Sequence, residues 1–163
     1  MSRWRPPRPK SSPYITLEGY QYLEAELKAL WERRKSVTAA LSAAAAEGDR
    51  SENAEYIYRK KELREIDRRI HYLQKRLPSL NVVSEKPNNR HQVFFGATVT
   101  LETEAGDEVR YRIVGADEIN SSGGLISLDS PLARLLLKKQ RDDEVVFRQA
   151  DRETRYYITD IEY

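Results

Sequence analysis

Two acidic residues stand close together in a short polar stretch of this 163-residue chain. Asp49 and Glu52 are three positions apart, a spacing that lets two carboxylates on one helical turn reach a common point. Two carboxylates with open approach can hold one Mg²⁺, which takes its other ligands from water, a partner or a phosphate. Such an ion lowers the pKa of a bound water and creates a nucleophile for phosphodiester hydrolysis. The pair therefore predicts half of a metal site.

A second explanation of the same pair is a helix cap. Asp49 would be the N-cap and Glu52 would reach back to its amide, as in a capping box. Capping boxes are far commoner than metal sites, and the two explanations are compatible because a cap can pre-set the carboxylates. No histidine or phosphate-cradling loop accompanies the acids, so we expect a donor of ligands and not a complete enzyme. Arg50, Ser51 and Asn53 are candidates for supporting the two carboxylates.

Two heptad patterns flank the acidic stretch and must position it. Both repeat apolar residues at alternating steps of three and four, which is typical of a coiled coil. The first consists of Tyr20, Leu23, Leu27, Leu30, Arg34, Val37, Leu41 and Ala44. The second consists of Tyr56, Arg59, Leu63, Ile66, Ile70, Leu73 and Leu77. Gly48 suits a left-handed helix end, and so short a connection makes the two helices antiparallel.

The register of this hairpin follows from its turn near residue 50. Facing residues should then have numbers that sum to about 100, so that Leu30 faces Ile70 and Leu27 faces Leu73. The seam arginines can lay their stems on aliphatic neighbours while their charged heads stay in water. Arms of this length make a projecting coiled coil roughly 48 Å long. We assign it to residues 13–80, with the acids at its tip.

Basic residues gather on the second predicted helix. The candidates for contact with phosphates are Arg59, Lys60, Lys61, Arg64, Arg68 and Arg69. A solvated helix face is the plain explanation of such a run, and sequence-independent binding of a nucleic acid backbone is the functional one. Residues 1–12 hold four Lys or Arg among three prolines, which predicts a disordered basic arm. This arm is a loose terminus or an additional nucleic acid contact.

The C-terminal half changes to a period of two, which indicates strands. After a linker at residues 81–90, the predicted strands are Val93–Phe95, Thr98–Glu102, Val109–Val114, Leu125–Leu128, Glu144–Arg148 and Arg155–Thr159. Ser130 and Pro131 suit the N-cap and first position of a short helix through Lys138. Residues 91–163 are thus a small, mostly antiparallel domain, and the whole chain has the α+β fold class.

Composition excludes several classes of function. The chain has no cysteine and two histidines, which excludes a disulfide framework and a structural zinc site. It shows neither a secretory signal at the start nor an apolar run of membrane-spanning length. We expect a soluble cytoplasmic protein with no membrane partner. An internally paired hairpin needs no second chain, so we expect a monomer.

Several motifs resemble one family, the bacterial Gre transcript-cleavage factors. The segment Gly48-Asp49-Arg50-Ser51-Glu52-Asn53-Ala54-Glu55-Tyr56 is similar to the tip signature of these factors. Phe95–Val99, Arg112–Gly115 and Ile126–Arg134 resemble motifs of their C-terminal domain. The tip and the basic helix resemble the GreB branch more than GreA. The similarity runs from about Ile15 to Tyr163, and the extension at residues 1–12 departs from it.

The resemblance implies a role inside bacterial RNA polymerase. The hairpin would enter the secondary channel of a backtracked enzyme, where Asp49 and Glu52 would help hold a Mg²⁺ shared with the polymerase. Hydrolysis of the extruded RNA 3′ end would follow, and the basic face would contact that RNA. The C-terminal domain, FKBP-like in fold, would dock on the largest catalytic subunit at the channel rim. The docking candidates implied by the resemblance are Asp129, Ser130, Pro131 and Leu132. The alternative function is a non-catalytic channel binder that regulates or inhibits the polymerase.

Overall fold

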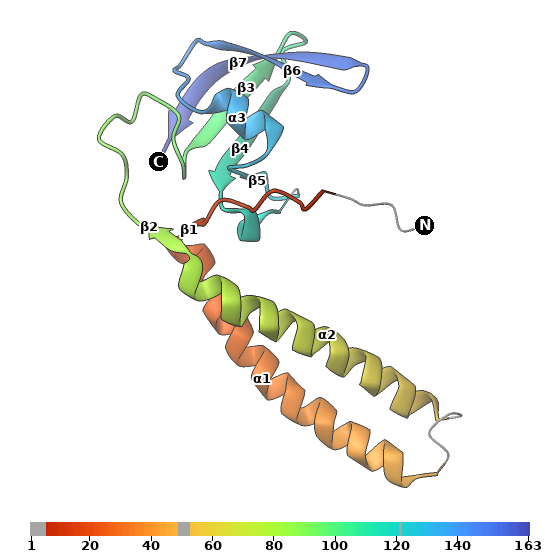
Figure 1. Cartoon of the computed structure of the whole chain (residues 1–163). Coiled ribbons are helices and arrows are strands. Elements are labelled where there is room, and N and C mark those ends of the chain that lie inside the picture. The colour runs from red at the N-terminus through yellow and green to blue at the C-terminus, as the bar shows by residue number, and fades with distance from the viewer. Residues whose placement is uncertain (1–5, 49–52, 121) are drawn as a thin grey trace. The chain divides into compact units, whose positions relative to one another are not determined.

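The chain folds into two compact units (Figure 1). The computed structural model describes residues 6–48, 53–120 and 122–163. One unit is a helical hairpin, Tyr20–Leu80, and the other is a globular unit built from Met1–Gly19 and Asn81–Tyr163. The division differs from the sequence-based boundaries, since residues 13–19 and the predicted linker 81–90 fall in the globular unit.

Two long helices form the hairpin unit. They are α1 (Leu17–Ala46) and α2 (Ala54–Arg76), and the short 3₁₀ turn η1 (Leu77–Ser79) follows. The apolar seam predicted from the heptads packs together. Its middle is a cluster of the buried residues Val37, Ile66 and Ile70 with the half-buried Leu27, Leu30 and Leu63. Burial of this one stripe on each helix supplies most of the stability of such a pair.

Ion pairs run along both sides of the seam and agree with the antiparallel register. Their nitrogen–oxygen distances lie between 2.5 and 2.7 Å. The cross-helix pairs are Arg33–Glu62, Arg34–Asp67 and Arg69–Glu26. The seam residue Arg34 keeps its head at the surface, with 36% of its side chain exposed, as expected for a long cationic side chain.

The globular unit is a mixed, mostly antiparallel sheet with one short helix. The five strands lie in the order β5-β4-β3-β7-β6, and only β4 and β5 are parallel. Their bounds are Thr98–Thr103 for β3, Glu108–Val114 for β4, Leu125–Ser127 for β5, Glu144–Gln149 for β6 and Arg152–Glu162 for β7. The α+β fold class predicted from the sequence is confirmed.

A separate pair of short strands was not predicted. The strand β1 (Tyr14–Thr16) directly precedes α1 and pairs in parallel with β2 (Asn81–Val83). The predicted strand Val93–Phe95 is wrong, because these three residues form no strand. The neighbouring Gln92 makes an isolated bridge to Gln140. Its apolar character reflects core packing, since Val93 is completely buried.

The core of the globular unit lies between the sheet and helix α3 (Pro131–Leu136). Leu132, Ala133 and Leu136 point into this core, together with sheet residues such as Ile113 and Ile158. The helix ends two residues before the predicted Lys138, which has a left-handed backbone with φ of 67°. In the described parts of the chain, no helix is both long and apolar enough to cross a membrane.

Candidate functional site

The structure describes the residues on either side of the acidic tip. Asp49, Arg50, Ser51 and Glu52 lie outside the described residues. On one side, α1 ends at Ala46 and Gly48 follows with φ of +134°, a conformation that L side chains rarely adopt. A glycine at this place was predicted from the sequence, because it ends a helix without steric cost.

On the other side, Asn53 begins the second helix. It is the N-cap of α2, and its Oδ1 accepts a hydrogen bond from the Tyr56 amide at 3.1 Å. Its Nδ2 donates to the carbonyl oxygen of Ala44 in α1 at 2.7 Å. The expectation of an N-cap at Asp49 is therefore corrected, because the helix begins four residues later. A capping box between Asp49 and Glu52 lies outside the described residues.

Metal binding by the tip stays a prediction. Among the described residues, no group of three or more His, Cys, Asp or Glu could hold a metal ion. The two tip acids offer carboxylate oxygens, which are the donors that Mg²⁺ prefers. Two such donors are fewer than a dedicated protein site supplies, so the donor set fits an ion shared with a second macromolecule.

Two of the six predicted RNA contacts on α2 are engaged within the protein. Arg59 pairs with Glu55 at 2.8 Å and Glu62 at 3.1 Å, and these hydrogen bonds raise the pKa of its guanidinium. Arg69 pairs with Glu26 across the hairpin at 2.6 Å. The partners of Arg59 lie on α2 itself, whereas Arg69 links α2 to α1. These pairs weaken the assignment of both residues as free phosphate contacts.

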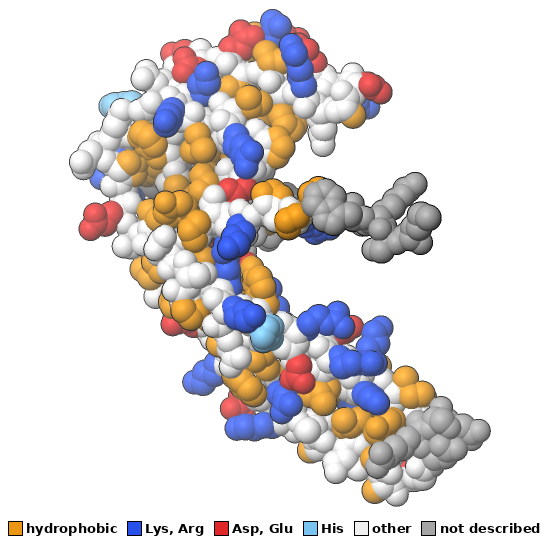
Figure 2. All heavy atoms as spheres, viewed as in Figure 1, with side chains coloured by type: hydrophobic (Ala, Val, Ile, Leu, Met, Phe, Trp, Pro, Cys, Tyr) orange, Lys and Arg blue, Asp and Glu red, His pale blue; other side chains and the backbone are white. Residues whose placement is uncertain are grey.

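Three of the other predicted contacts form a continuous basic stripe, defined as Lys61, Arg64 and Arg68. They are exposed and make no ion pair within the described part of the chain. Steps of three and four residues place them on one face of α2. Figure 2 shows Lys and Arg side chains gathered along the hairpin. Lys60 lies beside the stripe, with its ammonium 5.8 Å from the Tyr56 ring.

Exposed tyrosines accompany the basic residues. Tyr58 is 59% exposed and Tyr72 is 40% exposed. The guanidinium groups of Arg59 and Arg69 lie 5.5 and 5.3 Å from the centres of these two rings. Exposed rings beside cations suit the stacking of unpaired bases without sequence preference. The arrangement is therefore suited to single-stranded nucleic acid as well as to phosphate.

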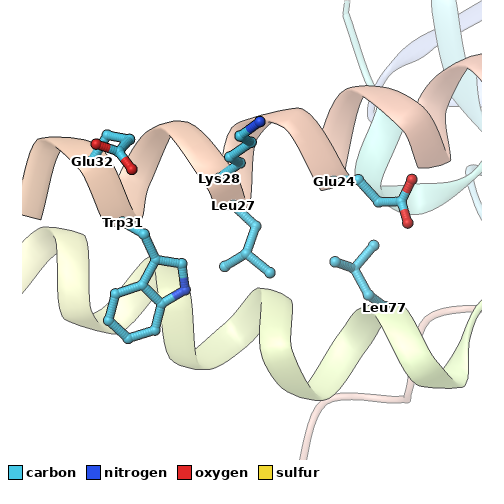
Figure 3. A pocket seen from close by; sticks show the side chains of 6 residues that line it. All are labelled: Glu24, Leu27, Lys28, Trp31, Glu32 and Leu77. Atoms are coloured by element: carbon cyan, nitrogen blue, oxygen red, sulfur yellow. The ribbon is translucent and has the colours of Figure 1, made fainter.

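A hollow in the hairpin was not foreseen from the sequence (Figure 3). Leu27 and Trp31 from α1 and Leu77 from η1 supply its apolar surface. Glu24, Lys28 and Glu32 make its charged rim. Trp31 is 42% exposed and lies outside the heptad seam, so the heptad pattern does not indicate it.

The four predicted docking residues differ in accessibility. Asp129 accepts a hydrogen bond from the Ser12 amide at 2.8 Å and another from the Ser12 hydroxyl, so the predicted basic arm is anchored at its end. Ser130 caps α3 by accepting from the Ala133 amide, as predicted. Leu132 is 8% exposed and packs in the core, whereas Pro131 is exposed.

An apolar groove continues from Pro131 over the surface of the globular unit. It is lined by Pro131, Leu135, Val146, Phe147 and Arg148. Leu135 is 36% exposed because α3 turns Leu132 and Leu136 into the core instead. Leu135 is therefore the surface residue that sequence reasoning missed here.

Comparisons with known proteins agree with this two-part architecture. A family model for the N-terminal part of transcription elongation factors matches residues 13–82, and a model for the GreA/GreB C-terminal part matches residues 87–163. The chain is 56% identical to transcription elongation factor GreB of Pseudomonas aeruginosa, over 100% of this chain and 98% of the relative. It is 62% identical to GreB of Xanthomonas axonopodis pv. citri, over 88% and 87% of the two chains.

Proposed function

Because this chain belongs to the GreA/GreB family of transcription elongation factors, we propose that it stimulates transcript cleavage by RNA polymerase. The hairpin enters the secondary channel of a backtracked bacterial polymerase in the cytoplasm. Its tip completes the site that cuts the extruded RNA 3′ end. The observation that carries the proposal is the side chain of Asn53, which starts α2 and fastens it to the end of α1 beside the segment that contains Asp49 and Glu52.

Asp49 and Glu52 would supply carboxylate oxygens to a Mg²⁺ shared with the polymerase. Bound there, the ion supplies a water of low pKa for phosphodiester hydrolysis. Asn53 acts as a support, because it fixes the start of α2 to the end of α1. Arg50 and Ser51 lie between the acids and are the further candidates for support. The protein contributes part of a site and is a stimulator of the polymerase, not an enzyme alone.

The basic stripe would hold the backtracked RNA. Lys61, Arg64 and Arg68 carry three positive charges along one exposed face. Phosphates bind such a stripe through a salt-sensitive term that does not depend on sequence. Tyr58 and Tyr72 add exposed rings for base stacking. Lys60 can add a fourth charge, whereas Arg59 is paired within α2 and Arg69 joins α2 to α1.

The globular unit would dock on the largest catalytic subunit at the channel rim. The N-terminal end of α3 and the apolar groove beside it are the proposed surface. Pro131 and Leu135 offer accessible apolar area there. Asp129 and Ser130 shape the loop through their bonds to Ser12 and Ala133, and Leu132 acts indirectly through the core.

Adding the protein to backtracked polymerase tests this function. With RNA labelled at its 3′ end and Mg²⁺ present, we expect short labelled fragments to be released and elongation to resume. Binding to polymerase without release of RNA would instead support a non-catalytic channel binder. Polymerase alone is the control for its intrinsic cleavage.

A further inference from the structure

The start of α1 has an incomplete cap of its own. Thr16 directly precedes the helix, and its Oγ1 accepts a hydrogen bond from the Gly19 amide at 3.1 Å. In a capping box, an acidic side chain at this third helical position bonds back to the amide of the cap residue. Gly19 has no side chain, so it cannot complete the box.

Glu118 completes the box from a distant part of the chain. It ends the 3₁₀ turn η2 (Ala116–Glu118) of the globular unit. Its Oε2 accepts from the Thr16 amide at 3.1 Å, and its Oε1 accepts from the Thr16 hydroxyl. The same Oε2 accepts from the Gly115 amide at 2.7 Å. Three donors therefore fix the carboxylate, and this carboxylate fixes the first turn of α1.

Two glycines make room for this arrangement. A Cβ on Gly19 would lie 2.0 Å from Oε1 of Glu118. A Cβ on Gly115 would lie 2.1 Å from the carbonyl oxygen of Tyr14 in β1. Glycine is a poor helix former, and its presence in α1 is explained by the Glu118 side chain that occupies the space. We name Thr16, Gly19, Gly115 and Glu118 the helix-start clamp.

The clamp acts on a helix that belongs to both units. The first turn of α1 lies in the globular unit, and the helix continues without interruption to Ala46 in the hairpin. We propose that Glu118 is a positioning residue, which limits the directions in which the hairpin leaves the globular unit. The consequence for cleavage rests on the proposed function, because the tip must reach the polymerase site while the globular unit is docked.

Distance measurements test the clamp without polymerase. The chain has no cysteine, so Ser42→Cys and Asp151→Cys, both at exposed positions, can carry two spin labels. We expect Glu118→Ala to broaden the distribution of distances between the labels by about twofold or more, in line with the loss of three fixed hydrogen bonds. Glu118→Gln, which keeps an acceptor oxygen, should restore much of the narrow distribution. Equal widths for wild type and Glu118→Ala would overturn the proposal.

A second substitution tests the same contact from the other side. Gly19→Ala should broaden the distribution in a chain that has Glu118, since the new Cβ displaces its carboxylate. Added to Glu118→Ala, it should cause no further broadening, because the clash has been removed. Additive broadening would contradict a clamp. Glu102→Gln, on an exposed glutamate of β3, is the matched control, and thermal unfolding identifies any variant that fails to fold.

Cleavage assays then separate the clamp from the proposed function. At saturating protein, Glu118→Ala should still bind polymerase and should lower the cleavage rate roughly 10- to 100-fold, the usual consequence of a small misplacement of reacting groups. Glu118→Gln should recover most of the rate. If the wild-type protein does not stimulate cleavage, the proposed function is wrong. The distances between the labels in wild type and Glu118→Ala still test the role of the clamp. A broadened distribution with an unchanged cleavage rate would refute the positioning role.

Discussion

The side-chain amide of Asn53 reaches across the hairpin and donates to the carbonyl oxygen of Ala44, with 2.7 Å between the two atoms. The same side chain caps α2 through the Tyr56 amide. One residue thus starts the second helix and fastens it to the end of the first. The last turn of α1 and the first turn of α2 are therefore held together on either side of the tip.

Substitution of Asn53 separates its two roles. Asn53→Ala should destabilise the hairpin by about 1–2 kcal/mol, the usual cost of a lost N-cap, and should slow cleavage. Asn53→Asp keeps the acceptor for Tyr56 but cannot donate to Ala44, so it should slow cleavage with little loss of helix stability. Thermal unfolding and cleavage assays measure the two effects. Wild-type cleavage by Asn53→Asp would show that the bond to Ala44 has no role at the tip.

Acid should weaken the hairpin through Glu62. Its hydrogen bond to Arg33, with a smaller contribution from Arg59, lowers the pKa of the Glu62 carboxyl. A lowered pKa in the folded state stabilises the protein above the ordinary glutamate pKa, and this contribution is lost as the pH falls through the folded value. Glu62→Gln should flatten that part of the stability–pH curve. Thermal unfolding between about pH 3 and 6 measures it.

Glu65 is the control for that measurement, since it is exposed on the same helix. Glu65→Gln should leave the acid dependence of unfolding close to that of wild type. An unchanged curve for Glu62→Gln would mean that its pairs with Arg33 and Arg59 add nothing to stability, as has been found for many surface ion pairs.

Removal of the basic stripe should weaken binding to backtracked complexes and reduce its salt dependence. We change Lys61, Arg64 and Arg68 together to Ala and plot the logarithm of the association constant against the logarithm of the salt concentration. The magnitude of the slope should fall by about 2, because each phosphate contact on a single strand contributes roughly 0.7 to it. Titrations at several salt concentrations measure this slope. Lys28→Ala with Lys35→Ala on α1 is the control, and an equal fall there would argue for general electrostatics.

The apolar groove should be needed for docking but not for folding. Leu135→Ser should weaken polymerase binding by about tenfold, in the range found for interface side chains that matter. The unfolding midpoint should hardly change, because Leu135 is partly exposed. Ile119→Ser, at another exposed apolar side chain of the globular unit, is the control. Unchanged binding of Leu135→Ser would exclude the groove as the docking surface.

The hairpin could be predicted from the sequence because its information is local. Each helix shows its own heptads, and the short connection leaves one register in which the two seams meet. The strand pair β1–β2 could not be predicted, since each strand has three residues and the whole hairpin separates the two in the sequence. Short strands carry too little periodicity to be separated from a helix start.

The residues of the candidate site also fall into those that local sequence indicates and those that it does not. Residue types and spacing led to Asp49 and Glu52, but Asp49 and Asn53 are equally good N-caps by residue type. The bond from Asn53 to Ala44 of the other helix is not visible in the sequence. No local sequence pattern indicates the role of Glu118, because its partner Thr16 is 102 positions away. Contacts of this kind depend on the folded arrangement and leave no local pattern.

The central claim is that Asp49 and Glu52 act in cleavage and not in binding or folding. Cleavage of 3′-labelled RNA in backtracked complexes tests it, with Asp49→Asn and Glu52→Gln combined so that both charges are removed at nearly constant shape. We expect polymerase binding within about twofold of wild type and a loss of cleavage on the order of 100-fold or more. Glu47→Gln, an exposed neighbouring acid, should cleave normally. Full cleavage by the double variant would contradict the claim.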